Sequence, residues 1–499
     1  MVELKRWLER IWRGLTLLAA AAAGVSGAAA AESIITYHHH ADRSGHYITP
    51  ELTWTEAATV RLDAGFHATV DGAIYAQPLY WVPPPGGGAA RIIVATENDF
   101  VYALDAGTGA QIWSTSLGTP VPAGELPCGN IQPTEGVTGT PTIDPKTGIV
   151  YLEAYVQTST GGPRHMVFGL SLATGNVVTP GWPVDVANGL AALGNVFNNG
   201  PQGQRSALTL VNGKLYVPYA GHDGDCGTYN GIVVGLNLAK PGVFGFWSTE
   251  LAAGGSWGQS GVAFDGKSMF VTTGNTRSST NSAWGGGEAV IRLPPTLTNP
   301  TQTADYFAPA NWQILDNEDL DLGGTSAIPI NISTVARVLA LGKDGNAYLL
   351  DRENLGGIGH PIFVTHVSTD QIRTAMATYP AADAAMVAFE GQGAACPSGQ
   401  SGNLVMLKVT PSAVATAWCA SFNGAGAPIV TTTDGKTDPI VWVVGAQGDG
   451  KLYGFRGTDG TPIAAAAGGS AAIEEFATIL WAHGRFYVAA NGAVYAFVH

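Results

Sequence analysis

Apolar positions along most of the chain form short alternating runs that Gly, Asp, Asn and Thr interrupt. In residues 101–109 (VYALDAGTG) such a run ends at a Thr-Gly turn, and the next run carries Trp113. Related stretches recur at residues 168–182, 234–247, 348–357 and 452–460. Short alternating runs with tight turns between them are typical of half-buried antiparallel strands. We therefore expect an all-β protein built from a repeated unit of strands.

One such unit per repeat predicts the blades of a β-propeller. The predicted blade cores cover residues 72–115, 137–186, 205–250, 260–308, 322–366, 373–421 and 427–464. An eighth blade would combine residues 478–498 with an outer strand from residues 54–62, which closes the ring by pairing the two termini. Closure removes exposed sheet edges, which otherwise favour aggregation. We predict eight four-stranded blades, with seven as the alternative.

The first 31 residues have the pattern of an export signal. Lys5, Arg6 and Arg10 precede an apolar stretch, which ends in small residues before a cleavage site near Ala31. That stretch is short for a membrane span, and no later stretch reaches the length of about 20 apolar residues that a span needs. We expect a single domain over residues 32–499, located in the periplasm or secreted.

Composition narrows the choice of partners. Only 12% of the residues are charged, while 67 are Gly and 29 are Pro. Without four basic and two acidic residues of the signal, the totals of 24 and 38 become 20 and 36, a net charge of −16. Such a surface repels phosphate backbones and disfavours nucleic acid as a partner.

Four cysteines point to ordinary disulfides in an oxidising compartment. They are Cys128, Cys226, Cys396 and Cys419, and their spacing leaves the pairing open. None belongs to a C-x-x-C-H motif, so no c-type haem is expected on this chain.

The repeat ending in Trp113 resembles the tryptophan-docking motif of the pyrroloquinoline quinone (PQQ) dehydrogenases, and similar repeats occur in propellers without a quinone. A second set of residues resembles the cofactor region of quinoprotein alcohol dehydrogenases. Trp257, in a Gly-Ser-Trp-Gly stretch, precedes Asn275 of a Thr-Gly-Asn stretch by 18 residues. Asp321 lies in Asp-Leu-Asp, where the family has Asp-x-Trp-Asp, and Lys343 lies in Gly-Lys-Asp-Gly-Asn.

The resemblance implies a role for each of these residues. Trp257 would be the floor under PQQ, Asn275 a calcium ligand, Asp321 the catalytic base and a metal ligand, and Lys343 the cation beside the quinone oxygens. The family's adjacent-cysteine disulfide is missing, and its acidic metal ligand has its nearest counterpart in Asp225.

Elementary chemistry agrees with these roles. An indole can stack on a planar quinone, a lysine can face its oxygens, and Ca²⁺ prefers carboxylate and amide oxygens. Glu135 is either a further polar contact of the cofactor in the central channel or a strand-end residue.

These observations favour an oxidoreductase that transfers hydride from a small alcohol or sugar to PQQ. Calcium or a lanthanide would fill the metal site, and a separate acceptor such as a cytochrome c would take the electrons. The alternative is a propeller scaffold or binding module without quinone, like outer-membrane assembly lipoproteins, although the lipobox cysteine of those proteins is absent. A third reading makes Asp319 and Asp321 the acid and base of a polysaccharide-active propeller. The tract His38–His40 is expected to pack on the propeller, with a transition-metal site as the other reading.

Overall fold

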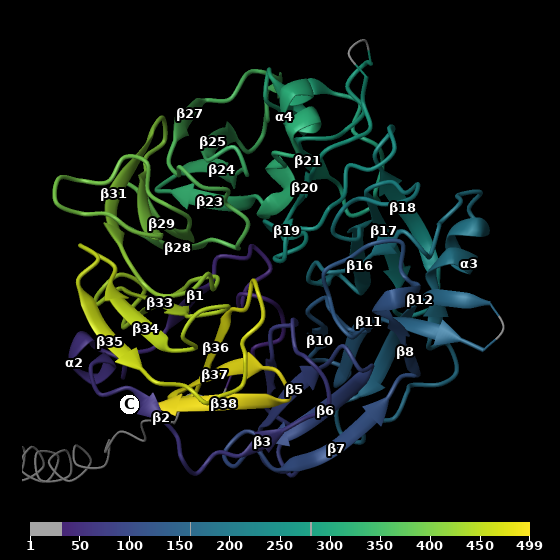
Figure 1. Cartoon of the computed structure of the whole chain (residues 1–499), viewed down its shortest axis with the longest axis horizontal. Helices are drawn as coiled ribbons and strands as arrows, with labels where there is room; N and C mark the ends of the chain where they lie inside the picture. The colour runs from purple at the N-terminus through teal and green to yellow at the C-terminus, as the bar shows by residue number, and fades with distance from the viewer. Residues whose placement is uncertain (1–31, 160, 280–281) are drawn as a thin grey trace, which may run out of the picture. The chain divides into compact units, whose positions relative to one another are not determined.

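The structure is a computed structural model, and it describes residues 32–159, 161–279 and 282–499. The expected export signal, residues 1–31, lies outside the described residues. Residues Ser33–His499 form one compact unit, in which the strands belong to eight sheets of four to six strands. The sheets follow one another around a ring in chain order (Figure 1). The unit is an eight-bladed β-propeller, which confirms the predicted fold class and the larger of the two blade numbers.

The first four blades contain the following strands. Blade 1 has β4 (Leu79–Trp81), β5 (Arg91–Ala95), β6 (Phe100–Asp105) and β7 (Gln111–Ser116). Blade 2 has β10 (Thr142–Asp144), β11 (Ile149–Thr158), β12 (Gly162–Ser171) and β13 (Val184–Asp185), extended by β8 (Thr119–Pro122) and β9 (Thr134–Glu135). Blade 3 has β14 (Gln202–Gly203), β15 (Thr209–Val211), β16 (Lys214–Gly221), β17 (Ile232–Asn237) and β18 (Val243–Ser248). Blade 4 has β19 (Ala263–Phe264), β20 (Met269–Thr273), β21 (Ala289–Leu293) and β22 (Tyr306–Ala308), with β26 (Gly357–Ile358) parallel to β22.

The other four blades complete the ring. Blade 5 has β23 (Ile328–Ile332), β24 (Val335–Leu341), β25 (Asn346–Asp351) and β27 (Phe363–His366). Blade 6 has β28 (Ala377–Pro380), β29 (Ala385–Glu390), β30 (Leu404–Val409) and β31 (Val414–Ala420). Blade 7 has β32 (Ile429–Thr432), β33 (Ile440–Val444), β34 (Leu452–Arg456) and β35 (Pro462–Ala466), with β1 (His46–Ile48) parallel to β32. Blade 8 has β36 (Ile479–Ala482), β37 (Arg485–Ala490) and β38 (Ala493–Val498), with β2 (Arg61–Leu62) and β3 (Ala68–Thr69) from the N-terminal side.

Short helices lie in the connections between strands. They are α2 (Trp54–Ala57), α3 (Val186–Ala191) and α4 (Trp312–Glu318), and the 3-10 helices η1 (Ala123–Glu125), η2 (Thr303–Asp305) and η3 (Leu322–Gly324). In the part of the chain that is described, no helix has the length and apolar character needed to cross a membrane.

The hydrophobic core is divided among the seams between neighbouring blades. Along β6, Val101 and Ala103 join the cluster shared with blade 2, while Tyr102 and Leu104 join the cluster shared with blade 8. Successive side chains of a strand point to opposite faces, so a blade packed on both faces has an almost continuous apolar strand. This packing explains the apolar runs of the repeat.

The repeated tryptophan joins one blade to the next. The indole of Trp113 in blade 1 donates a hydrogen bond to the carbonyl of Leu172 (3.0 Å) and covers the turn at Gly175 in blade 2. Trp418 in blade 6 donates to the carbonyl of Gly457 (2.8 Å) in blade 7. A Cβ at Gly175 would lie 2.7 Å from the Trp113 ring, so the turn needs glycine for this contact as well as for its left-handed backbone.

The N-terminal side of the chain closes the ring, as the sequence predicts. Strand β2 pairs antiparallel with the last strand, with Arg61 opposite Val498. Next to this pair, Arg485 Nη1 lies 2.5 Å from Asp63 Oδ2. The last blade is therefore assembled from both ends of the propeller domain.

The segment before β1 packs against the inner strands of several blades. Arg43 is fully buried, and its guanidinium donates to the carbonyls of Tyr37, Leu208 and Val262 and to the hydroxyls of Thr36 and Thr209. His38 contacts Thr478 through its Nε2 atom (3.1 Å). The prediction that the histidine tract packs on the propeller is confirmed.

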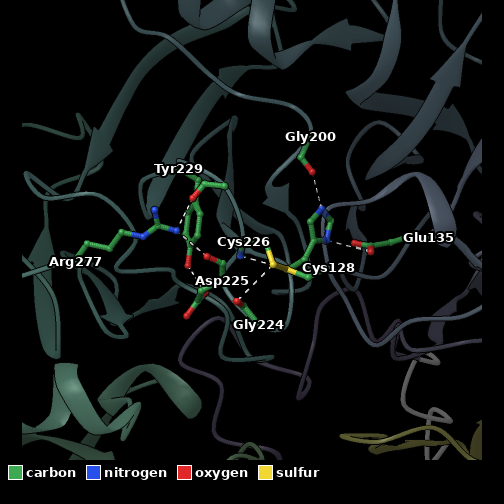
Figure 2. Close-up of a disulfide and its surroundings, with 10 residues drawn as sticks. Cys128, Glu135, Gly200, Gly224, Asp225, Cys226, Tyr229 and Arg277 are labelled. Carbon is green, nitrogen blue, oxygen red and sulfur yellow. Dashed lines mark hydrogen bonds and ion pairs between the residues drawn. A yellow bond between two sulfur atoms is a disulfide. The ribbon is translucent and has the colours of Figure 1, made fainter.

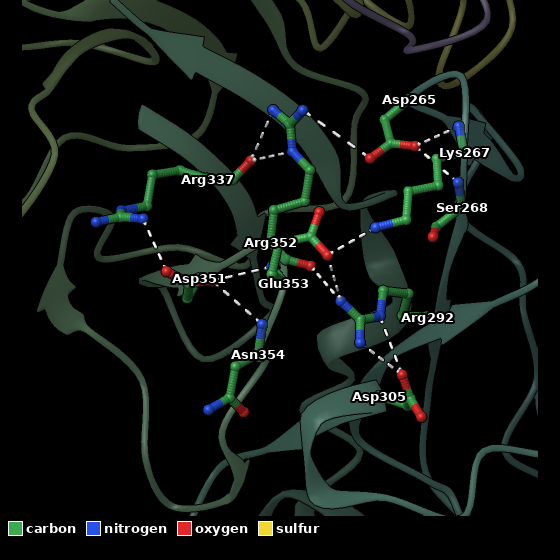
Figure 3. A network of polar contacts seen from close by, with 10 residues as sticks. All are labelled: Asp265, Lys267, Ser268, Arg292, Asp305, Arg337, Asp351, Arg352, Glu353 and Asn354. Atoms are coloured by element: carbon green, nitrogen blue, oxygen red, sulfur yellow. Dashed lines mark hydrogen bonds and ion pairs between the residues drawn. The ribbon is translucent and has the colours of Figure 1, made fainter. Parts of the chain in front are cut away.

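Charged side chains hold the seam between blades 4 and 5 (Figure 3). Arg292 on β21 pairs with Asp305 (2.7 Å) and donates to the carbonyl of Arg352 (2.7 Å) beyond β25. Lys267 pairs with Glu353 (2.9 Å) across the same seam. The seam joins the two blades that carry Asn275 and Lys343.

Candidate functional site

Asp321 lies in a tight turn between blades 4 and 5. Helix α4 ends just before Asp319, which adopts the left-handed conformation (φ 54°), and η3 begins at Leu322. The backbone N–H of Lys343 donates to the carbonyl of Asp321 (2.9 Å), and that of Leu322 donates to the carboxylate of Glu288 (2.7 Å). The side chain of Asp321 is only 4% exposed. The backbone of the turn that carries Asp321 is thus held from both neighbouring blades.

Glycine lets the Asp321 turn approach the end of β20 closely. A Cβ at Gly274 would lie 2.5 Å from Asp321 Oδ1, and a Cβ at Gly323 would lie 2.7 Å from the Gly274 nitrogen. Only hydrogen fits at these positions without displacing the backbone or the carboxylate. Because of this approach, the backbone N–H of Asn275 donates to Asp321 Oδ1 (2.8 Å).

Trp257 and Lys343 contact the other oxygen of the same carboxylate. The indole N–H of Trp257 donates to Asp321 Oδ2 (3.0 Å), and Lys343 Nζ lies 2.7 Å from that oxygen. The ammonium is also 3.1 Å from Asp319 Oδ1 and 5.1 Å from the centre of the Trp257 ring. Burial alone would lower the pKa of Lys343, but Asp321 and Asp319 outweigh it and raise the pKa above its ordinary value. Lys343 is therefore a permanent cation beside the indole face.

The Asn275 amide bridges Asp321 and Asp225. Its side chain lies 3.0 Å from Asp321 Oδ1 and 3.2 Å from Asp225 Oδ2, and it donates to both when the amide nitrogen faces them. The Tyr229 hydroxyl donates to the second oxygen of Asp225. Burial raises the pKa of Asp225, and the Asp321 carboxylate adds to the rise.

These three side chains form a donor set that suits a hard cation. With the Asn275 oxygen turned inward, one amide and two carboxylate oxygens face one another, and such oxygens are the ligands of Ca²⁺. Among residues 32–499 as described, no group of three or more His, Cys, Asp or Glu side chains is placed to hold a metal ion. The protein therefore offers an incomplete shell, and a cation would take its other ligands from water or a bound molecule.

Five of the predicted site residues line one cavity. Trp257, Asn275, Asp321, Lys343 and Asp225 all line it, and it is partly open to solvent. Its acidic side chains are Asp223, Asp225, Asp319, Asp321 and Glu475, and its basic ones are Arg205, Lys343 and Arg373. Five carboxylates against three cations leave the wall net negative, which favours a cation or a ligand that arrives with one.

Glu135 does not join this group. Its carboxylate is buried behind the cavity wall, 3.2 Å from Nδ1 of His222, and His222 is the residue that faces the cavity. Burial raises the pKa of Glu135, but the hydrogen bond and charge of His222 outweigh it and lower the pKa below its ordinary value. The side chain of His222 lies between Glu135 and the cavity, so Glu135 is not placed to contact a cofactor directly.

Buried acids surround Glu135, and sequence patterns did not reveal them. Glu97, Asp99 and Glu153 lie in blades 1 and 2 with almost no exposed surface. Burial, strengthened by Glu135, raises the pKa of Glu97 to about 8, and burial with Glu153 raises that of Asp99 to about 9. His165 Nδ1 lies 2.6 Å from Glu153 Oε1. Most of these carboxyls are therefore neutral at pH 7.

A disulfide supports the turn that carries Asp225 (Figure 2). Cys128, from the connection between blades 1 and 2, pairs with Cys226, which directly follows Asp225 in blade 3. Arg277 donates to the carbonyl of Asp225 (2.7 Å) from the other side. Cys396 pairs with Cys419 within blade 6. The pairing that the sequence left open is thus resolved, and one of the two bonds lies beside the site.

Several cavity residues had no sequence signal. Tyr229, Arg205, Phe476 and Arg373 face the cavity but belong to no motif, and Glu288 supports Asp321 from a Gly-rich stretch. A charged residue in a glycine-rich loop was the only hint available for Glu288. The others are brought together from separate blades, so spacing along the chain could not indicate them.

Solved structures with a similar fold include quinone enzymes. The quinohemoprotein alcohol dehydrogenase from Comamonas testosteroni has 16% identity, a TM-score of 0.63, and coverage of 93% of this chain and 80% of that one. A europium-containing methanol dehydrogenase has 13% identity, a TM-score of 0.62, and coverage of 94% and 98%. BamB from Moraxella catarrhalis has 13% identity, a TM-score of 0.50, and coverage of 88% and 100%.

These likenesses concern the fold. No protein-family model and no curated protein sequence matches the chain. The chain has the eight-bladed fold found in PQQ-dependent alcohol dehydrogenases, which confirms the resemblance at the level of architecture.

Proposed function

We propose that the chain is a quinoprotein dehydrogenase, which oxidises an alcohol or sugar hydroxyl with PQQ and a calcium or lanthanide ion. The observation that carries the proposal is the convergence of Trp257, Asn275, Asp321 and Lys343 on one cavity, with Asp225 beside them. These residues come from three blades and are joined by contacts of 2.7–3.2 Å. A scaffold has no need for a lysine, a carboxylate and an indole in this arrangement.

The charge of the cavity supports a site that requires a cation. PQQ is a polyanion, and a net negative wall would repel it in the absence of a metal ion. Asp225, Asn275 and Asp321 would hold the ion, and Lys343 would face the oxygens of the quinone. When bound, PQQ supplies a two-electron acceptor and the ion a Lewis acid.

The protein's own residues would orient the substrate and move its proton. Lys343 Nζ lies 2.7 Å from Asp321 Oδ2, and the Asp321 carboxylate would accept the hydroxyl proton of an alcohol. Trp257 holds the same carboxylate through its N–H and offers its ring face for stacking. An alcohol bound in the cavity would give its hydroxyl proton to Asp321, and PQQ held beside Trp257 and Lys343 would supply the two-electron acceptor for its carbon-bound hydrogen.

Location and partners follow from the same proposal. The N-terminal pattern would direct the chain to the periplasm, where a separate acceptor such as a cytochrome c would receive the electrons. The four cysteines are all engaged in the two disulfides, in keeping with an oxidising compartment.

Reconstitution tests the proposal. Purified protein is incubated with PQQ and CaCl₂, with PQQ and LaCl₃, or with PQQ and a chelator, and dye reduction is measured with a panel of alcohols and sugars. We expect turnover with a metal ion and none with the chelator.

Asp321→Asn is the matched variant, because it preserves the shape of the side chain. It should keep the melting temperature within a few degrees and lose turnover by about 10³-fold or more. Absence of PQQ binding under every metal condition would overturn the proposal and leave the scaffold reading. Equal turnover of Asp321→Asn and wild type would remove Asp321 from the mechanism.

A further inference from the structure

Asn130, Arg205 and Glu475, from distant parts of the chain, form a hydrogen-bonded group in the wall of the cavity. Together with the neighbouring Phe476 we call this group the latch. Asn130 donates through its amide to Glu475 Oε1 (2.7 Å), and Arg205 donates to Asn130 Oδ1 (3.0 Å). Arg205 Nη1 also lies 3.5 Å from Glu475 Oε1. Asn130 belongs to the connection between blades 1 and 2, Arg205 to the start of blade 3, and Glu475 to the connection between blades 7 and 8. The latch therefore spans the ring.

Phe476, next to Glu475, places its ring inside the cavity. Its ring centre is 6.3 Å from that of Trp257, with 53° between the planes, and 5.8 Å from the Arg205 guanidinium. Its backbone is left-handed (φ 62°), which is unusual for a bulky side chain. Surrounding contacts must hold Phe476 in this conformation, and functional sites are a common place for such strain.

The Phe476 ring and a stacked ligand compete for the same space. A flat molecule between two rings needs about 3.5 Å on each side, or about 7 Å in total. The 6.3 Å between Phe476 and Trp257 is too small, and the two rings are not parallel. A ligand that enters between Trp257 and Phe476 must therefore move Phe476.

The Glu475 carboxylate and a carboxylate of such a ligand would compete for the guanidinium of Arg205. Arg205 Nη1 lies 3.5 Å from Glu475 Oε1, which is longer than a hydrogen bond of a well-aligned guanidinium–carboxylate pair. The pair is partly exposed, with side chains 16% and 19% accessible. A carboxylate held in the better geometry would displace Glu475 from Arg205.

We propose that Glu475 and Phe476 are an internal occupant of the ligand site. A planar ligand with carboxylates replaces both: its ring takes the place of Phe476 on Trp257, and a carboxylate takes the place of Glu475 at Arg205 and Asn130. This inference rests on the proposed function, since it takes the ligand to be PQQ with its metal ion. It adds Arg205 and Asn130 as the carboxylate-binding residues and explains how a cavity that Phe476 partly fills admits a tricyclic molecule.

Binding measurements with two latch variants test the proposal. The dissociation constant of PQQ is measured by calorimetry at saturating CaCl₂ for wild type, Glu475→Gln and Phe476→Gly. A closed conformation reduces the apparent affinity in proportion to its population, so both variants should bind PQQ about tenfold more tightly. Glycine also suits the left-handed backbone at this position, so Phe476→Gly should not lose stability from strain. Arg205→Met should bind more weakly than wild type by about tenfold or more.

Asp223→Asn is the matched control for charge. Asp223 lines the same cavity but takes no part in the latch, so its variant measures the effect of removing one negative charge alone. The proposal is supported when Glu475→Gln gains more affinity for PQQ than Asp223→Asn does and Phe476→Gly also binds PQQ more tightly than wild type.

Three results would overturn the proposal, and they differ in what they leave standing. If wild type binds PQQ and the latch variants bind no better than Asp223→Asn, the latch is wrong and the proposed function stands. If neither wild type nor any variant binds PQQ, both the proposed function and the latch are wrong. Weaker binding by Phe476→Gly would show that Phe476 is a stacking surface and would also reject displacement.

Discussion

Trp257 and Asp321 form one hydrogen-bonded unit, in which the indole N–H donates to the carboxylate at 3.0 Å. The aromatic floor of the cavity and its buried acid are therefore positioned together. Truncating either side chain would remove this hydrogen bond from the other. The contribution of the indole therefore cannot be separated from that of the carboxylate by truncation.

Replacing Trp257 should weaken ligand binding in steps. Trp257→Phe keeps an aromatic face but loses the N–H and part of the ring, so PQQ should bind about tenfold more weakly. Trp257→Ala should bind PQQ about tenfold more weakly than Trp257→Phe. Calorimetry with CaCl₂ gives the affinities. Trp113→Phe is the control, since it also removes one indole hydrogen bond (3.0 Å to Leu172) but lies between blades 1 and 2. Equal affinities for Trp113→Phe and Trp257→Phe would contradict the stacking role.

Removing Lys343 should destabilise the protein in a way that calcium corrects. Lys343→Met leaves Asp321, with a side chain only 4% exposed, without its ammonium partner. Breaking a buried ion pair costs about 3 kcal/mol of unfolding free energy. In the presence of a chelator, the unfolding free energy of Lys343→Met should be lower by this full amount. Millimolar CaCl₂ should raise the unfolding free energy of the variant more than that of wild type. Denaturant unfolding measures both values.

Lys267→Met provides the comparison for Lys343→Met. Its ion pair with Glu353 is exposed, with side chains 72% and 63% accessible, and should contribute less than about 1 kcal/mol. If Lys343→Met lost no more stability than this control and gained nothing from calcium, the charge balance inferred for the site would be wrong.

The two disulfides should differ in their effect on the site. Cys128 and Cys226 are 98 residues apart, and Cys396 and Cys419 are 23 apart. Replacing either pair with serine should lower the unfolding free energy, by about 5 kcal/mol for the longer loop and about 3 kcal/mol for the shorter one. Only the loss of Cys128–Cys226 should also weaken calcium binding, because Cys226 follows Asp225 directly. Calcium titration of the two double variants measures their affinities for the ion. An equal loss of calcium affinity in both would show that the Cys128–Cys226 disulfide has no special role at the site.

The buried acids should make the protein less stable as the pH rises from 6.5 to 8. Unfolded Glu97 loses its proton near its ordinary pKa of 4.5, while the folded protein retains that proton up to about pH 8. The folded state then binds more protons than the unfolded state, so stability falls with rising pH, by up to about 1.4 kcal/mol per pH unit for each such group. Asp99, with its pKa raised to about 9, acts in the same direction. Below pH 6.5 the buried His165, with its pKa lowered to about 3, acts oppositely, because its unfolded form takes up a proton.

Urea unfolding at pH 6.5, 7.25 and 8 measures this slope. Glu97→Gln should make it shallower by about one proton, whereas Glu125→Gln, outside the buried cluster, should leave it unchanged. A stability that rises across this interval would mean that the acids are ionised in the folded protein.

Arg43 should be among the most sensitive positions for folding. It is fully buried and has only neutral acceptors, which lie in its own segment and in blades 3 and 4. Arg43→Met removes all five of these hydrogen bonds from a buried site, and within the described part of the chain only the Val262 carbonyl keeps another donor, the Thr209 hydroxyl, so we expect a loss of about 3–5 kcal/mol. Arg61→Met, exposed on β2, should change the stability by less than about 0.5 kcal/mol. Thermal unfolding compares the two, and similar melting temperatures would show that Arg43 does not fasten the segment.

The fold could be predicted from the sequence because a propeller blade is a local structure. Residues 101–113 contain a strand, its turn, and the tryptophan that docks on the next blade, so each repeat shows its own pattern. Blade order, ring closure and the eighth blade follow from counting such repeats. Strand β2 confirms that the N-terminal side closes the ring, but only Arg61–Leu62 of the predicted strand over residues 54–62 is extended, and Trp54–Ala57 forms helix α2 instead. Trp257, Asn275, Asp321 and Lys343 were found through short motifs, each carried by one turn.

The rest depended on contacts between turns that are far apart in the chain. Asn130 and Glu475 are 345 residues apart yet lie 2.7 Å from each other, and no local pattern can indicate such a pair. The same holds for the pairing of Cys128 with Cys226 and for the position of Glu135 behind His222. The sequence by itself determined the strands, their repeat and the chemical groups available. Only the tertiary structure decided which of these groups meet, because the ring brings the ends of separate blades together around one cavity.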